Sequence, residues 1–160
     1  MRKHYTSWST KGITITNISS TRDYTIHDPP LTEAGKKQAI AIRINYPFLS
    51  NPSAFLVSSP FRRTLQTSLI AFHQKPLPNP YLQENSNKPC DTGSPRSILE
   101  AEFPGLNFNL VVDGWDSKTG EWASDDETLD KRASKVREWL REYPEDEIIV
   151  VTHGGARSIV

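Results

Sequence analysis

Two short runs of apolar residues in this chain have the length and composition of buried strands. Residues 54–58, with the sequence AFLVS, end in small polar residues, and residues 147–152, with the sequence EIIVVT, include four consecutive β-branched apolar residues. Continuous apolar runs of this kind are typical of strands covered on both faces, as in a parallel sheet. Apolar and polar residues alternate at Gly12–Thr16 instead, which favours an edge strand there.

The segments on either side of the first run carry the end signals of helices. Thr32 can cap a helix that continues to about Asn45 and ends before a proline. Ser59 can cap a second helix with Pro60 at its first position, where the missing N–H group costs no hydrogen bond. We therefore expect one helix before the first strand and another directly after it.

A third helix is predicted before the second strand. Ser124 and Glu127 have the spacing of a capping box. The apolar residues that follow recur at steps of four and three, which places them on one stripe of a helix: Leu129, Ala133, Val136, Leu140 and Tyr143. Pro144 is expected to end this helix.

The middle of the chain follows neither the helical nor the strand period. Residues 73–95 contain five of the 12 prolines and few aliphatic residues, so we expect a long excursion over the surface, of a kind that often carries function. Ser94 can begin a short helix that extends through Leu99. Residues 105–120 are expected to form a loop anchored by Trp115.

This order of elements predicts an α/β domain built in layers around a mostly parallel sheet. We assign residues 23–160 to that domain, and residues 1–22 to an atypical N-terminal segment for which disorder is one alternative. Ligands of such sheets bind at the carboxyl ends of the strands. The residues that follow the two predicted strands are therefore the first candidates for function.

Composition excludes several classes of function. Lys and Arg together number 19, as do Asp and Glu, so no net charge favours nucleic acid or an anionic membrane surface. No apolar run has the length of a membrane span. The single cysteine, Cys90, excludes an internal disulfide and a cysteine-based zinc site, and it favours a reducing compartment, which we take to be the cytoplasm. Residues 1–20, rich in Ser and Thr and without acidic residues, leave a transit peptide open.

Candidate chemistry follows the first strand, where Arg62 and Arg63 lie in the first turn of a predicted helix. Cations there oppose the helix dipole, and a bound anion would offset that cost, because arginine gives planar, bidentate donors to phosphate. The alternative is a pair of exposed surface arginines. His153 follows the second strand, with two glycines after it that let the backbone come close to a ligand. Glu84, in the excursion, could donate a proton to a leaving alcohol.

Four segments, in this order, resemble the histidine phosphatase superfamily, which has the phosphoglycerate-mutase-like fold. Residues 28–39 resemble the opening of its first helix, and residues 58–67 its phosphate-binding segment, with Arg63 at the position of the binding arginine. Residues 82–84 resemble its acid/base segment, followed at residues 89–93 by PCDTG, a variant of fungal members. Residues 151–154 resemble its second histidine motif.

The resemblance implies a three-layer fold and a division of labour at one site. Two arginines and the second histidine would hold the phosphoryl oxygens and stabilise their charge, and of these Arg63 and His153 keep their places here. The arginine next to the nucleophile is missing, and Arg62 is the further candidate for phosphate binding that the sequence offers. Glu84 would protonate the leaving oxygen. The family needs no metal and no organic cofactor. The expected ligand is phosphate or a small phosphorylated substrate.

This chain departs from the family at both ends. The nucleophile of the family is a histidine in an Arg-His-Gly-like motif after the first strand, and no residue before Asp28 stands in such a motif. Neither His4, which follows no apolar run, nor His27 fits that position. The chain also stops at Val160, inside the helix expected after Gly155. We therefore expect a missing or replaced first strand and a truncated C-terminus.

The main hypothesis is a phosphatase-like or mutase-like protein with impaired activity. Two alternatives stay open: a non-catalytic phosphate-binding module, and a truncated product that does not fold stably. A metal enzyme is disfavoured because the four histidines share no ligand spacing, and a nucleotide site at His153 because the glycine pattern is incomplete. The sequence predicts neither the substrate nor the oligomeric state.

Overall fold

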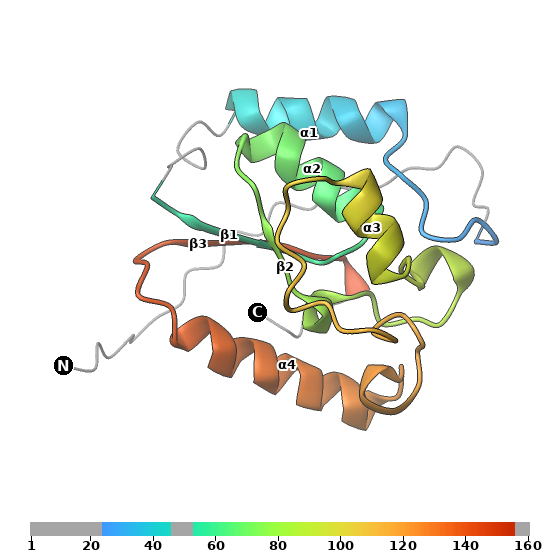
Figure 1. The fold of residues 1–160 in the computed structure, drawn as a ribbon. Coiled ribbons are helices and arrows are strands. Elements are labelled where there is room, and N and C mark those ends of the chain that lie inside the picture. The colour runs from blue at the N-terminus through green and yellow to red at the C-terminus, as the bar shows by residue number, and fades with distance from the viewer. Residues whose placement is uncertain (1–23, 46–52, 156–160) are drawn as a thin grey trace.

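The computed structural model of the protein describes residues 24–45 and 53–155 (Figure 1). The predicted N-terminal segment, with its edge strand at Gly12–Thr16 and His4, lies outside the described residues. The same holds for the helix expected after Gly155.

The sheet of the described region has three parallel strands in the order β2–β1–β3. The two predicted strands are confirmed as β1, Phe55–Ser58, and β3, Ile148–Val151, and they pair along their full length. The third is β2, Leu77–Pro78, on the other side of β1. β1 is covered on both faces as predicted, whereas β3, with β1 as its neighbour among the described residues, is only half-buried along its length.

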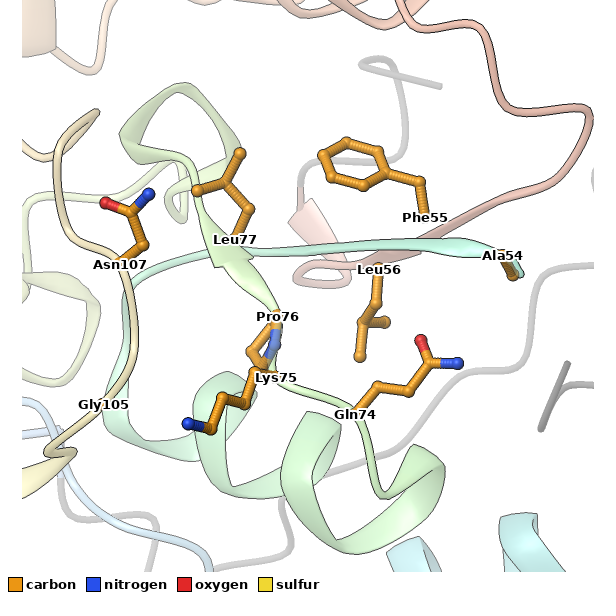
Figure 2. A pocket seen from close by; sticks show the side chains of 9 residues that line it. All are labelled: Ala54, Phe55, Leu56, Gln74, Lys75, Pro76, Leu77, Gly105 and Asn107. Atoms are coloured by element: carbon orange, nitrogen blue, oxygen red, sulfur yellow. The ribbon is translucent and has the colours of Figure 1, made fainter. Parts of the chain in front are cut away.

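Helices cover both faces of this sheet, which confirms the predicted α/β layers (Figure 1). Helices α1, Glu33–Asn45, and α2, Arg62–Phe72, lie on one face, and α4, Asp126–Arg141, lies on the other. Leu56 packs in the first layer with Ile42, Ala71 and Phe72. Val57 packs in the second with Leu82, Ala133, Val136 and Leu140. Figure 2 shows the same alternation one residue earlier, with Phe55 and Leu56 on opposite sides of β1.

A further apolar cluster lies between α2, the short helix α3, Arg96–Glu102, and the loop that follows α3. Its centre is Trp115, which is fully buried and contacts Phe61 edge-on at 5.7 Å between ring centroids. The predicted short helix and the predicted Trp anchor are therefore both confirmed. This cluster includes Phe61 and Leu65, so it packs against the start of α2.

The start of α2 differs from the prediction. The helix begins at Arg62, and Phe61 takes the N-cap position without a capping side chain, so a cap at Ser59 is wrong. The carboxylate of Asp28 acts instead: Oδ1 accepts the Arg62 N–H at 3.2 Å, and Oδ2 accepts the N–H and hydroxyl of Ser94 at 3.0 and 2.8 Å. A partner 34 residues away in the chain has no signal in the local pattern.

Helices α1 and α4 are capped by residues that directly precede them in the sequence. Thr32 caps α1 as predicted, because its hydroxyl accepts the Gly35 N–H at 3.1 Å. In α4 the N-cap is Asp125, whose carboxylate accepts the Thr128 N–H at 3.0 Å, and not the predicted Ser124. The spacing of the capping box therefore placed the start of α4 one residue too early.

The excursion at residues 73–95 is not a surface segment throughout. It contributes β2 and two short 3₁₀ helices, Pro80–Leu82 and Pro89–Asp91, and both Leu82 and Gln83 are fully buried. Each 3₁₀ helix has a proline in its first turn, where a missing N–H group is tolerated. The prolines thus begin short turns that return the chain to the core.

Candidate functional site

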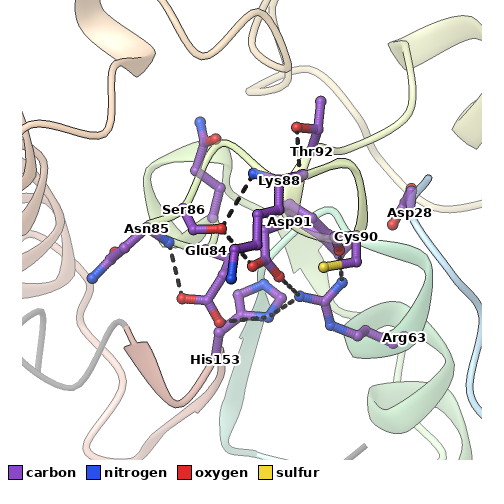
Figure 3. A network of polar contacts seen from close by, with 12 residues as sticks. Asp28, Arg63, Glu84, Asn85, Ser86, Lys88, Cys90, Asp91, Thr92 and His153 are labelled. Atoms are coloured by element: carbon purple, nitrogen blue, oxygen red, sulfur yellow. Dashed lines mark hydrogen bonds and ion pairs between the residues drawn. The ribbon is translucent and has the colours of Figure 1, made fainter. Parts of the chain in front are cut away.

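The candidate site lies where β1 and β3 end, because parallel strands present their carboxyl ends at one edge of the sheet. Arg63 projects from the first turn of α2, directly after β1. His153 follows β3 by two residues, and Glu84 follows the first 3₁₀ helix. Figure 3 shows the three side chains directed toward one another from these separate segments.

The guanidinium of Arg63 is held by three acceptors. Nη1 donates to the carbonyl oxygen of Cys90 at 2.8 Å. Nη2 donates to Oδ1 of Asp91 at 3.2 Å and to Nδ1 of His153 at 3.1 Å. The group also lies over the ring of Phe61, with Cζ 4.7 Å from the ring centroid. These contacts fix the plane of the fork, so its donors face one direction.

The imidazole of His153 is buried and neutral. Because arginine can only donate, Nδ1 of His153 is the acceptor of the Arg63 bond, and Nε2 carries the proton that it donates to Oγ of Ser59 at 2.8 Å. Burial lowers the pKa of His153 well below its usual value, and the cations Arg63, Lys118 and Arg132 lower it further. His153 therefore enters any reaction near neutral pH without a charge.

Glu84 places a carboxylate next to this imidazole, with Oε2 3.9 Å from Nδ1 of His153. Its other oxygen, Oε1, accepts the N–H of Asn85 at 2.9 Å, and the Asn85 amide donates to the carbonyl of Gly155 at 2.6 Å. A Cβ atom at Gly155 would lie 2.2 Å from Oε1 of Glu84. Gly155 thus makes room for the carboxylate.

Asp91 connects the two sides of the network. Its Oδ2 accepts the hydroxyl of Ser86 at 2.7 Å, while Oδ1 accepts from Arg63, as the dashed lines of Figure 3 mark. A carboxylate therefore takes the position on Arg63 that an oxyanion of a ligand would take. A phosphate that binds Arg63 in the same plane would compete with Asp91.

Two cations of the site were missed by the sequence analysis. Lys118 donates to the carbonyl oxygen of Glu84 at 2.7 Å, and burial, together with nearby Arg132, lowers the pKa of Lys118 to about 8. Arg132 of α4 is 1% exposed and donates to the carbonyl oxygen of Gln83 at 2.8 Å. Burial lowers the pKa of Arg132 to about 10. Lys118 carries no motif signal, and Arg132, next to Ala133 in the apolar stripe, reads as an ordinary polar helix residue.

The side chain of Arg62 points elsewhere. Its Nε donates to a carboxylate oxygen of Glu102 at 2.6 Å. The structure therefore brings Arg63, Glu84 and His153 together but leaves Arg62 outside their network. Contact between Arg62 and phosphate stays a prediction. His27 and His73 are exposed residues outside the same network.

A separate open pocket of about 290 Å³ lies at the amino ends of β1 and β2 (Figure 2). Its lining is mainly apolar, with Gln74, Lys75 and Asn107 as the polar side chains.

Within residues 24–45 and 53–155, no three His, Cys, Asp or Glu side chains are grouped so that they could hold a metal ion. None of the helices in these ranges combines the length and apolar character needed to cross a bilayer.

Comparison with known proteins gives consistent matches. The model of the histidine phosphatase superfamily (branch 1) matches residues 14–160. The probable phosphatase SPAC513.02 of Schizosaccharomyces pombe is 31% identical over 137 residues, which cover 80% of this chain and 63% of that protein. Phosphoglycerate mutase-like protein 1 of Arabidopsis thaliana is 25% identical over 185 residues, which cover 88% and 64%. The chain thus spans less than two thirds of the length of either relative.

Proposed function

The chain belongs to the histidine phosphatase superfamily, and on this premise we propose that it binds phosphomonoesters and acts on them in a phosphatase-like or mutase-like way. The observation that carries the proposal is the contact of 3.1 Å between Nη2 of Arg63 and Nδ1 of His153, 90 residues apart in the chain. The parallel pairing of β1 with β3 brings these two residues to the same edge of the sheet.

The proposed work of each residue follows from its contacts. Arg63 exchanges its single contact with the carboxylate of Asp91 for phosphoryl oxygens, which a guanidinium can bind with two parallel hydrogen bonds. When phosphate takes the donor of Arg63, Nδ1 of neutral His153 is released, and the imidazole can carry its one proton on Nδ1 and donate it to a phosphoryl oxygen while Nε2 accepts from the Ser59 hydroxyl. Glu84, whose carboxyl group lies beside the imidazole, protonates the leaving oxygen of the ester while a water molecule forms the new bond to phosphorus, and the proton that this water releases returns to Glu84.

We further propose that turnover is slow, because the sequence offers no Arg-His-Gly-like nucleophile. Loss of a covalent nucleophile costs roughly 10⁶-fold in rate in a well-studied serine protease. A non-catalytic phosphate-binding module is the second candidate. It is favoured by the exposure of His27 and His73, which leaves His153 as the histidine of the described site.

Phosphate binding is tested by thermal unfolding with and without inorganic phosphate. Phosphate at about 100 times its Kd should stabilise the protein by about 2.7 kcal/mol and raise Tm accordingly. Arg63→Ala should remove this shift. Arg96→Ala is the matched control, since the Arg96 side chain is paired with Glu100 in α3 at 2.7 Å, and it should keep the shift. A protein whose Tm does not respond to phosphate would contradict both candidate functions.

Catalysis is tested by hydrolysis of p-nitrophenyl phosphate. We expect a slow rate that His153→Ala abolishes and His4→Ala leaves unchanged. Loss of the rate in His4→Ala would show that the nucleophile prediction is wrong. A protein that binds phosphate but gives no rate above that of the His153→Ala variant would favour the non-catalytic module.

A further inference from the structure

Lys118 brings its ammonium group to the residues of the proposed phosphate site, with Nζ 2.7 Å from the carbonyl oxygen of Glu84. It comes from the loop after α3 and has a positive φ of 56°, a conformation that a residue other than glycine adopts at a cost. Such strain persists where surrounding contacts enforce it and is common at functional sites. The loop conformation thus carries this side chain into the site.

The ammonium of Lys118 lies among the groups already described. Nζ is 5.8 Å from the centroid of the Phe61 ring, over which Arg63 also lies and against whose edge His153 packs. Its hydrogen bond to the Glu84 carbonyl uses one of three N–H groups. Two donors are left for other acceptors near Phe61.

The charges around Lys118 do not balance. The ionisable groups that face Lys118 are Arg63 of α2, Arg132 of α4, Glu84 and Asp91. The charge of Lys118 also lowers the pKa of His153, which is neutral. Three cations therefore stand against two carboxylates. Bringing three cations together with two acids is costly in a partly buried site, and a dianionic ligand would relieve the repulsion.

We propose that Lys118 is a further substrate-contact residue, whose ammonium donates to a phosphoryl oxygen held by Arg63 while it keeps its bond to the carbonyl of Glu84. This inference rests on the proposed function of the same site. Lys118 would then have a second role: because it contacts both the phosphate and the backbone of Glu84, it would hold Glu84 in place when the ligand is bound.

The proton on Lys118 provides a readout that a purely structural lysine would not give. With a pKa of about 8, Lys118 is partly deprotonated in the free protein at pH 8.5. Bound phosphate favours the charged form, so binding should take up a fraction of a proton at that pH. Inorganic phosphate itself is almost wholly dianionic there and contributes little.

The experiment is titration calorimetry of inorganic phosphate at pH 8.5 in two buffers with different ionisation enthalpies. The unmodified protein should show proton uptake. Lys118→Met should show none and bind phosphate roughly 10- to 100-fold more weakly, as expected for loss of charged hydrogen bonds. Lys118→Arg should keep the affinity without proton uptake, because arginine stays charged. Lys131→Met, at an exposed lysine paired with Glu127, is the control and should behave as the unmodified protein.

The outcomes separate the two claims. Unchanged affinity and proton uptake in Lys118→Met would overturn the assignment of Lys118, while the loss of binding in Arg63→Ala would still support the proposed function. Absence of phosphate binding in the unmodified protein would overturn both. Far-UV circular dichroism and Tm without phosphate establish that the Lys118→Met variant is folded; if it is not, Lys118→Arg decides alone, since proton uptake in that variant contradicts the assignment.

Discussion

His153 depends on neighbours that no local pattern contains. Ser59 accepts its Nε2 proton, Arg63 donates to its Nδ1, and Glu84 lies 3.9 Å from the same nitrogen. The sequence predicts that the glycines after His153 leave room for a ligand. In the structure, Gly155 makes room for the carboxylate of Glu84, which is a constraint on the site itself.

The two glycines offer a matched pair of variants. Gly155→Ala should displace the Glu84 carboxylate, because the new Cβ would lie 2.2 Å from Oε1, and should lower any phosphatase rate by about 10²-fold, the lower end of what a general acid contributes. Since the end of a flexible side chain can move, Tm should change little. Gly154→Ala meets no atom within 4 Å and should leave the rate unchanged. Equal rates for both variants would contradict this placement of Glu84.

The helices and strands of the described region were predictable to the extent that their signals are local. The apolar runs that became β1 and β3, the Thr32 cap of α1 and the stripe of α4 as far as Leu140 are confirmed, because each depends on a few consecutive residues. The end of α4 predicted at Pro144 is wrong, because the helix ends at Arg141 and Tyr143 lies beyond it. The start of α2 was not predictable in this way, because Asp28 caps it from 34 residues away. Lys118 and Arg132 were missed for the same reason, since only the fold brings them to Glu84.

The cap of α4 can be tested directly. Asp125→Ala should lower Tm, because the Thr128 N–H loses its acceptor and the helix loses a negative charge at its first turn. Ser124→Ala should leave Tm unchanged. If Ser124→Ala lowered Tm more than Asp125→Ala, Ser124 would be the N-cap, as predicted from the sequence, and the assignment of Asp125 would be wrong.

The pH dependence of unfolding belongs to the whole molecule, because every shifted group contributes to it. The pKa of His153 is lowered on folding, so the unfolded chain binds a proton below about pH 6.5 that the folded protein does not. The contribution of His153 to the free energy of unfolding should therefore be fully present above about pH 6.5. As the pH is lowered further, the free energy of unfolding should decrease by up to about 1.4 kcal/mol per pH unit. Burial raises the pKa of Asp28, which acts in the opposite sense as the pH falls toward 4.

The contribution of His153 is obtained as a difference. His153→Gln should be less stable than the unmodified protein at pH 7.5, since it alters the contacts with Ser59 and Arg63, and the gap should narrow between pH 6.5 and 5 in urea unfolding. Asp28 is present in both proteins, so its effect cancels. A gap that stays constant over this range would show that His153 is not held neutral by the fold.

The separation of 90 residues between Arg63 and His153 also bears on synthesis. A nascent chain in which β3 has not yet been synthesised already contains α2 and Glu84, but it lacks the imidazole of His153 that completes the network. Any gain in stability from phosphate bound between these two residues thus arrives only after nearly all of the described domain has left the ribosome. Earlier folding steps must rely on contacts that do not involve His153, such as the apolar layers and the hydrogen bonds of Asp28 with Arg62 and Ser94.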